Sequence, residues 1–134
     1  MRSALAVTVL LAAGLVASVA TAQNDKITAT FESLAASGVS GDVTLNPMPN
    51  GEIQLHSTVK GLVPDAQYTV FVFDQNQTCG VGTNAIPVAT ITANPAGVAN
   101  FNQKVPLALS SIRSIGIEQS PANTLVACAS VPVQ

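Results

Sequence analysis

Apolar and polar residues alternate along most of the chain after residue 25, and Gly, Pro and Asn interrupt the alternation. Neighbouring side chains of a β-strand point to opposite faces, so this alternation is typical of strands with one buried face, while breaks at intervals of roughly eight to twelve residues are typical of sandwiches. Helical periodicity is weak. The pattern predicts an all-β sandwich or barrel of about eight strands, at 26–31, 39–45, 52–60, 67–73, 88–92, 99–105, 114–118 and 125–133.

Two of these strands have informative patterns. The strand at 67–73 is apolar on nearly every residue, which predicts that both of its faces are covered. The strand at 52–60 places Ile53 and Leu55 on one face and His56 on the other, beside other polar side chains. His56 is the chain's single histidine, and this pattern predicts that it lies at the surface.

The first residues are typical of a secretory signal peptide. Arg2 provides a basic start, an uncharged apolar run covers 4–19, and the sequence Ala-Thr-Ala at 20–22 resembles a cleavage site. A transmembrane anchor is the other interpretation, but the run is too short and lacks a basic stop-transfer flank. The sequence therefore predicts a signal peptide at 1–22 and one mature domain at 23–134, secreted to an extracellular or periplasmic space, with no membrane insertion.

Secretion changes the interpretation of the two cysteines. In an oxidising compartment a chain with two cysteines most simply pairs them, which predicts a disulfide between Cys79 and Cys128. Two free thiols that serve a metal or redox site are the alternative. The segment Asn76-Gln77-Thr78, just before Cys79, is an N-glycosylation sequon in a predicted loop, so Asn76 is a possible glycosylation site.

Charge and candidate chemistry are sparse. The chain has 5 Lys and Arg against 7 Asp and Glu, without a basic cluster, which argues against nucleic acid and anionic membranes as partners. One histidine and scattered carboxylates do not supply the three or four convergent ligands of a metal site, and no Gly-x-Ser-x-Gly elbow is present. The residues alone thus predict no cofactor and no recognisable catalytic group.

Three segments and their spacing resemble the Cu/Zn superoxide dismutase family. They are IQLHSTVKGL at 53–62, ITANPAGVA at 91–99 and LVAC at 125–128. Cys79 stands where the family's other half-cystine stands. The resemblance implies a Greek-key β-barrel, with copper and zinc as the cofactors of the resembled family.

The departures from the family pattern fall on its metal ligands. The resemblance places Val70 and Val72 at the first two copper imidazoles, Asn84 and Pro87 at two zinc ligands, and Glu118 at another copper histidine. Hydrocarbon side chains have no lone pair for a metal, so the resemblance implies that the copper and zinc sites are lost.

The expected function is therefore a non-catalytic, secreted, dismutase-like domain with a binding or structural role. If the loops leave Tyr68, Val70 and Val72 uncovered, these residues form an apolar contact strip for an unknown protein or small-molecule partner; otherwise they are buried. Two alternatives remain, a divergent copper-binding dismutase with a reorganised site and an unrelated all-β adhesin or envelope domain. The oligomeric state is left open.

Overall fold

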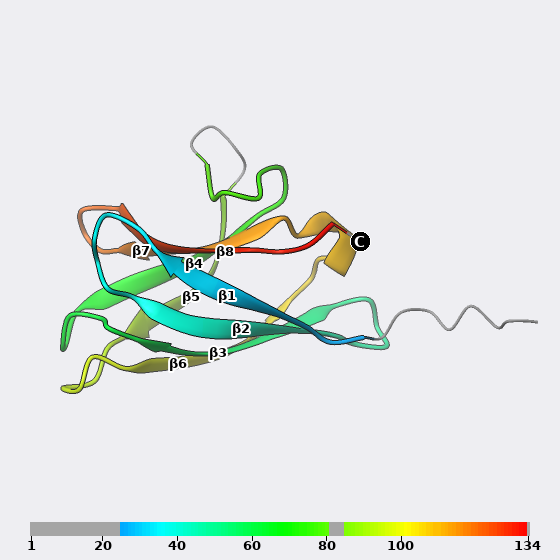
Figure 1. The fold of residues 1–134 in the computed structure, drawn as a ribbon. Helices are drawn as coiled ribbons and strands as arrows, with labels where there is room; N and C mark the ends of the chain where they lie inside the picture. Colours follow the sequence, from blue (N-terminus) through cyan, green and yellow to red (C-terminus); the bar gives the residue numbers. More distant parts are fainter. Residues whose placement is uncertain (1–24, 81–84, 134) are drawn as a thin grey trace, which may run out of the picture.

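The computed structural model describes residues 25–80 and 85–133, so the predicted signal peptide and Asn84 lie outside the described residues. Eight strands account for most of this part of the chain (Figure 1). Their bounds are β1 (Ile27–Ser33), β2 (Ser40–Pro47), β3 (Ile53–Lys60), β4 (Gln67–Phe73), β5 (Ala85–Thr92), β6 (Ala99–Val105), β7 (Ser114–Gln119) and β8 (Thr124–Ser130). One short 3-10 helix, η1 (Leu109–Ser111), precedes β7. Within the described ranges, no helix is long and apolar enough to cross a membrane.

All neighbouring strands pair antiparallel in one sheet, in the order β5-β4-β7-β8-β1-β2-β3-β6. The two end strands, β5 and β6, contact each other without forming a hydrogen-bonded ladder in the described part of the sheet. The sheet is thus curled into a nearly closed barrel, and the prediction of an all-β fold with about eight strands is confirmed.

Strand β5 begins at Ala85, before the predicted start at residue 88. Pro87 cannot donate a hydrogen bond, which is why the sequence favours a later start. In the structure Pro87 lies opposite Phe71 of β4, and β5 is an end strand of the sheet. An end strand has one unpaired edge, so the missing N–H costs little there. At the other end of the chain, β8 stops at Ser130 rather than at residue 133.

The barrel interior holds a continuous apolar core to which all eight strands contribute. Side chains that face inward alternate with outward ones, as on β3, where Ile53, Leu55 and Val59 are buried and His56 is exposed. The prediction that His56 lies at the surface is therefore confirmed. Burial of apolar surface at roughly 25 cal/mol per Å² is the main stabilising contribution of this core.

Four loops gather at one end of the barrel, those that follow β1, β3, β5 and β7 (Figure 1). The loop after β3 is bonded to the loop after β5, because Leu62 N donates to Gly97 O at 3.0 Å and Asp65 N donates to Ala93 O at 3.1 Å. A Cβ on Gly61 would overlap the carbonyl oxygen of Gly38, in the loop after β1. This end is thus closed by loops whose backbones approach more closely than a side chain permits.

Gly61→Ala is expected to lower the free energy of unfolding by about 3 kcal/mol, because Gly61 has a φ of +75° and the new methyl group would meet backbone rather than a movable side chain. Gly51→Ala is the matched control, since Gly51 has a φ of +84° but open space around its Cβ position. The control should lose only about 1 kcal/mol. Urea unfolding measures both variants, and equal losses would show that the loops are not in close contact.

Candidate functional site

Strand β4 carries the two residues, Val70 and Val72, that the resemblance matches to copper ligands of the dismutase family. Tyr68, Val70 and Val72 are 1%, 0% and 0% exposed and belong to the barrel core, whereas Thr69 and Phe71 point to the outside and are half-buried. Of the two expectations for Tyr68, Val70 and Val72, burial is therefore the one that the structure shows, and these residues do not form an exposed contact strip. Tyr68 also accepts a hydrogen bond at its hydroxyl from Val63 N at 2.8 Å, which ties the core to the loop after β3.

Because Val70 points inward, a copper ligand on β4 that is open to solvent would have to stand one position away from it, on the outward face. A metal that reacts with a dissolved substrate needs outward-facing ligands, and on β4 these positions belong to Thr69 and Phe71. Thr69 lies opposite Glu118 of β7, and Phe71 lies opposite Gly116. The alternation of apolar and polar residues could not show which side chains of β4 point inward, since β4 has apolar residues on both faces. Neither Thr69 nor Phe71 offers an imidazole.

Glu118 is half-buried on the outer surface of β7, and no hydrogen bond or ion pair to its carboxylate forms within the described residues. Burial raises the pKa of Glu118 above its ordinary value of 4.5, because the surrounding protein disfavours the charged form. The single carboxylate thus lies between the hydroxyl-bearing Thr69 on one side and Leu125 of β8 on the other.

Glu118→Gln is expected to raise stability at neutral pH by no more than about 0.5 kcal/mol. In the folded protein Glu118 holds its proton to a higher pH than in the unfolded chain, so its contribution to stability is largest below about pH 4.5 and is lost as the pH rises through the raised pKa. Urea midpoints measured across this window should therefore decline more steeply for the wild type than for Glu118→Gln. Parallel profiles would contradict the burial of this carboxylate.

The outer face of β4, β5 and β7 does not fit the copper and zinc ligation of the resembled family. Thr69, Phe71, Pro87 and Glu118 present a hydroxyl, a phenyl ring, a pyrrolidine ring and one carboxylate, whereas zinc and copper sites use several imidazole, thiolate or carboxylate ligands. Pro87 is exposed on β5, opposite Phe71. Across residues 25–80 and 85–133, no group of three His, Cys, Asp or Glu side chains gathers at one point.

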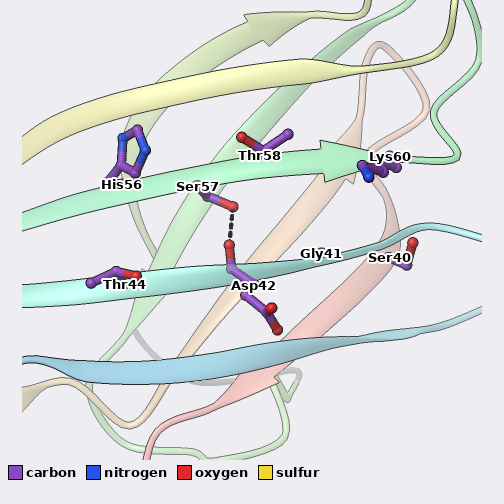
Figure 2. A pocket seen from close by; sticks show the side chains of 8 residues that line it. All are labelled: Ser40, Gly41, Asp42, Thr44, His56, Ser57, Thr58 and Lys60. Carbon is purple, nitrogen blue, oxygen red and sulfur yellow. Dashed lines mark hydrogen bonds between the residues drawn. The ribbon is translucent and has the colours of Figure 1, made fainter.

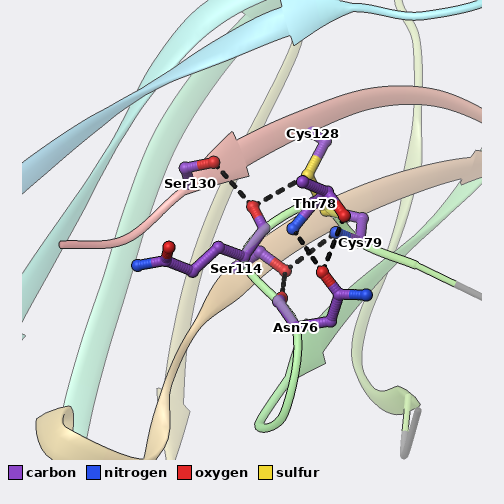
Figure 3. Close-up of a disulfide and its surroundings, with 7 residues drawn as sticks. Asn76, Thr78, Cys79, Ser114, Cys128 and Ser130 are labelled. Atoms are coloured by element: carbon purple, nitrogen blue, oxygen red, sulfur yellow. Dashed lines mark hydrogen bonds between the residues drawn. A yellow bond between two sulfur atoms is a disulfide. The ribbon is translucent and has the colours of Figure 1, made fainter. Parts of the chain in front are cut away.

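The predicted disulfide between Cys79 and Cys128 is confirmed (Figure 3). It joins the loop after β4 to β8, and both sulfurs lie in a second apolar cluster with Phe73, outside the barrel. Leu125 and Phe71 pack against the same cluster. Strand β4 is thus covered on its inner face by the barrel core and over much of its outer face by this cluster, as its apolar pattern predicts.

Hydrogen bonds hold the disulfide loop to β7 and to the end of β8. Ser114 is fully buried, accepts a hydrogen bond at Oγ from Cys79 N at 3.2 Å and donates one to the carbonyl oxygen of Asn76. Ser130 Oγ donates to the carbonyl oxygen of Gln77 at 2.6 Å. The loop therefore has polar attachments on both sides of the covalent link (Figure 3).

Asn76 lies in this loop and is half-buried. Its Oδ1 accepts hydrogen bonds from Thr78 N at 2.8 Å and from Thr78 Oγ1 at 2.6 Å, so the first and last residues of the sequon contact each other. Glycosylation of Asn76 stays a prediction.

A shallow groove runs along the outer face of β2 and β3, where His56 lies (Figure 2). Its volume is about 440 Å³. The residues that line it are mostly polar and come from these two strands: Ser40, Gly41, Asp42, Thr44, His56, Ser57, Thr58 and Lys60. Ser57 points inward and donates from Oγ to the carbonyl oxygen of Asp42 at 2.6 Å. The signal that could have located the groove is the polar side of the β3 alternation, together with the missing side chain at Gly41.

Comparison with known proteins does not assign the chain to a family. No family model matches it, and a search of curated proteins found no match either.

Proposed function

We propose that the chain is a secreted, dismutase-like β-barrel without dismutase activity, which acts outside the cytoplasm by binding or as a structural component. The observation that carries the proposal is the outer face of β4 and β7, where Thr69, Phe71 and Glu118 occupy the solvent-facing positions at which a copper site open to substrate would need imidazoles. Electron transfer on copper depends on such ligands, so a barrel that has replaced them keeps the frame without the redox centre.

The order of the strands supports the dismutase-like frame. Strand β4 pairs with β5, and β5 contacts β6, so these three consecutive strands also follow one another around the barrel. The chain then returns so that β7 pairs with β4. Three consecutive strands with the fourth beside the first is the pattern of a Greek key, the topology that the resemblance implies. The disulfide between the loop after β4 and the last strand adds support, since the resemblance places the family's cystine there.

Metal analysis tests this proposal. The full chain is exported to an oxidising compartment in medium that contains copper and zinc, and is purified without chelators. We expect far less than one equivalent of either metal by mass spectrometry and no superoxide consumption above that of free buffer. A functional Cu/Zn dismutase produced and purified in parallel is the control for metal supply.

Two results would contradict the proposal. Stoichiometric copper together with superoxide dismutation would favour the divergent enzyme with a reorganised site. An experimental strand order that separates β7 from β4 would favour the unrelated all-β domain.

A further inference from the structure

The outer face of β2, β3 and β6 carries a regular array of polar side chains, which we call the polar face. Nine residues form it in three rows, each row running across the three strands in register. The rows are Asp42, Thr58 and Asn100; Thr44, His56 and Asn102; and Asn46, Gln54 and Lys104. All nine side chains are exposed or half-buried, whereas the residues that alternate with them on these strands, such as Leu45, Leu55 and Phe101, are buried in the core.

Hydrogen bonds along the surface orient much of this array. Thr58 Oγ1 donates to Asn100 Oδ1 at 2.7 Å, and Gln54 Nε2 donates to Asn102 Oδ1 at 2.7 Å. Both asparagine amides use their oxygens in these bonds, which leaves their N–H groups available to a ligand. His56 lies at the centre of the array, and its imidazole forms no hydrogen bond with any other described residue. The shallow groove covers the β2 and β3 part of this face (Figure 2).

The chemistry of the polar face is mostly neutral, and Lys60, in the adjoining part of the groove, adds one further cation beside it. Asp42 and Lys104 occupy opposite corners and carry opposite charges, and the other seven positions hold Thr, Asn, Gln and the single His. Only 9% of the whole chain is charged, compared with about 25% in typical soluble domains. A surface without a cluster of cations does not fit nucleic acid, and one without Trp, Tyr or Arg among its nine residues lacks the usual anchors of a protein interface.

A ligand that matches such a surface presents many uncharged donors and acceptors along its length. Adjacent strands lie about 4.8 Å apart, which is close to the length of one sugar unit in an extended polysaccharide chain. The groove is shallow and open, so it suits a chain that lies across the strands better than a single enclosed sugar. We infer that the polar face binds an extended, uncharged polysaccharide, with His56 and Asn102 at the centre of the contact. The inference rests on the proposed function, because it names the ligand of a non-catalytic binding domain.

Sedimentation with insoluble polysaccharides tests the inference on the full mature chain. The probes are powders of cellulose, chitin and β-1,3-glucan, all uncharged, with a sulfated polysaccharide resin for comparison. We expect retention on at least one uncharged powder, in 0.5 M salt as well as at low salt. A soluble hexasaccharide of the same chain should release the protein, whereas the single sugar should not.

The double variant His56→Ala with Asn102→Ala should reduce retention about tenfold, because both donors at the centre of the face are removed. Both positions are exposed, so the variant should melt within a few degrees of the wild type. The matched control is Gln67→Ala with Thr92→Ala, an exposed pair in register on β4 and β5, and it should bind as the wild type does.

Three outcomes would overturn the inference: no retention on any of the three powders, equal retention of both double variants, or retention that occurs only on the sulfated resin and disappears with salt. The last result would indicate a ligand recognised by charge. None of these outcomes changes the metal content or the superoxide assay, so failure of this inference is distinguishable from failure of the proposed function.

Discussion

Val70→Asp is expected to prevent the domain from folding. Val70 is fully buried in the barrel, and its neighbours across the sheet, Ala89 on β5 and Ile117 on β7, provide no partner for a carboxylate. Burial of an unpaired charge costs more than about 4 kcal/mol, and an isolated charge in an apolar interior costs far more, so the loss can exceed the net stability of a domain, roughly 5–15 kcal/mol. The circular dichroism spectrum should lose its strand signal, and the protein should accumulate in the insoluble fraction.

Gln67→Asp is the matched control, because Gln67 belongs to the same strand and its side chain is exposed. This variant should fold and melt within a few degrees of the wild type. If Val70→Asp also melted near the wild type, Val70 would have to face solvent. The contact strip of Tyr68, Val70 and Val72 would then return as the favoured interpretation, and the assignment of Thr69 and Phe71 to the outer face would fall.

Removal of the disulfide has the second largest expected effect. Cys79 and Cys128 are separated by 49 positions, and the chain-entropy model gives about 4 kcal/mol for closing a loop of this length in the unfolded chain. The double variant Cys79→Ser with Cys128→Ser should therefore unfold at a much lower urea concentration than the wild type. Reduction of the wild type should have nearly the same effect, since it removes the same link.

Ser114→Ala separates the contribution of the covalent link from that of the hydrogen bonds around it. Ser114 Oγ bonds to two backbone groups of the disulfide loop, and its removal leaves both without that partner. The loss should be about 1–3 kcal/mol with the disulfide still present. If reduction left the urea midpoint of the wild type unchanged, the disulfide would not constrain the unfolded chain. If Ser114→Ala cost as much as the double cysteine variant, the polar attachments would be the main restraint on this loop.

The outer face of β4 shows where sequence reasoning reached its limit. The sequence identified β4 as a strand covered on both faces, which is correct, but it assigned Val70 and Val72 to the side of the metal site. In the structure Val70 and Val72 face the barrel core, and Thr69 and Phe71 face outward. An amphipathic strand reveals its register through alternation, whereas a strand that packs apolar residues on both faces carries no such signal. Register is equally hard to read from the sequence of any strand that is covered on both faces.

The polar face illustrates a second limit. The exposed positions of β3 could be predicted from alternation alone, since His56 lies between Gln54 and Thr58 on the side opposite Ile53 and Leu55. Their neighbours Asn100 and Asn102 lie more than forty positions away in the chain, on β6. Only the pairing of β3 with β6 brings the two sets together, because the chain passes through β4 and β5 before it returns.

The sequence by itself determined the all-β class, the approximate positions of the strands, the exposure of His56 and the pairing of the two cysteines. These properties follow from local alternation, from turn residues and from the chemistry of two thiols. The tertiary structure decided which face of β4 is interior, which residues surround Glu118 and which polar side chains form rows across β2, β3 and β6. Those properties depend on register between strands that are distant in the chain, and closure of the barrel sets that register by burying one face of every strand at once.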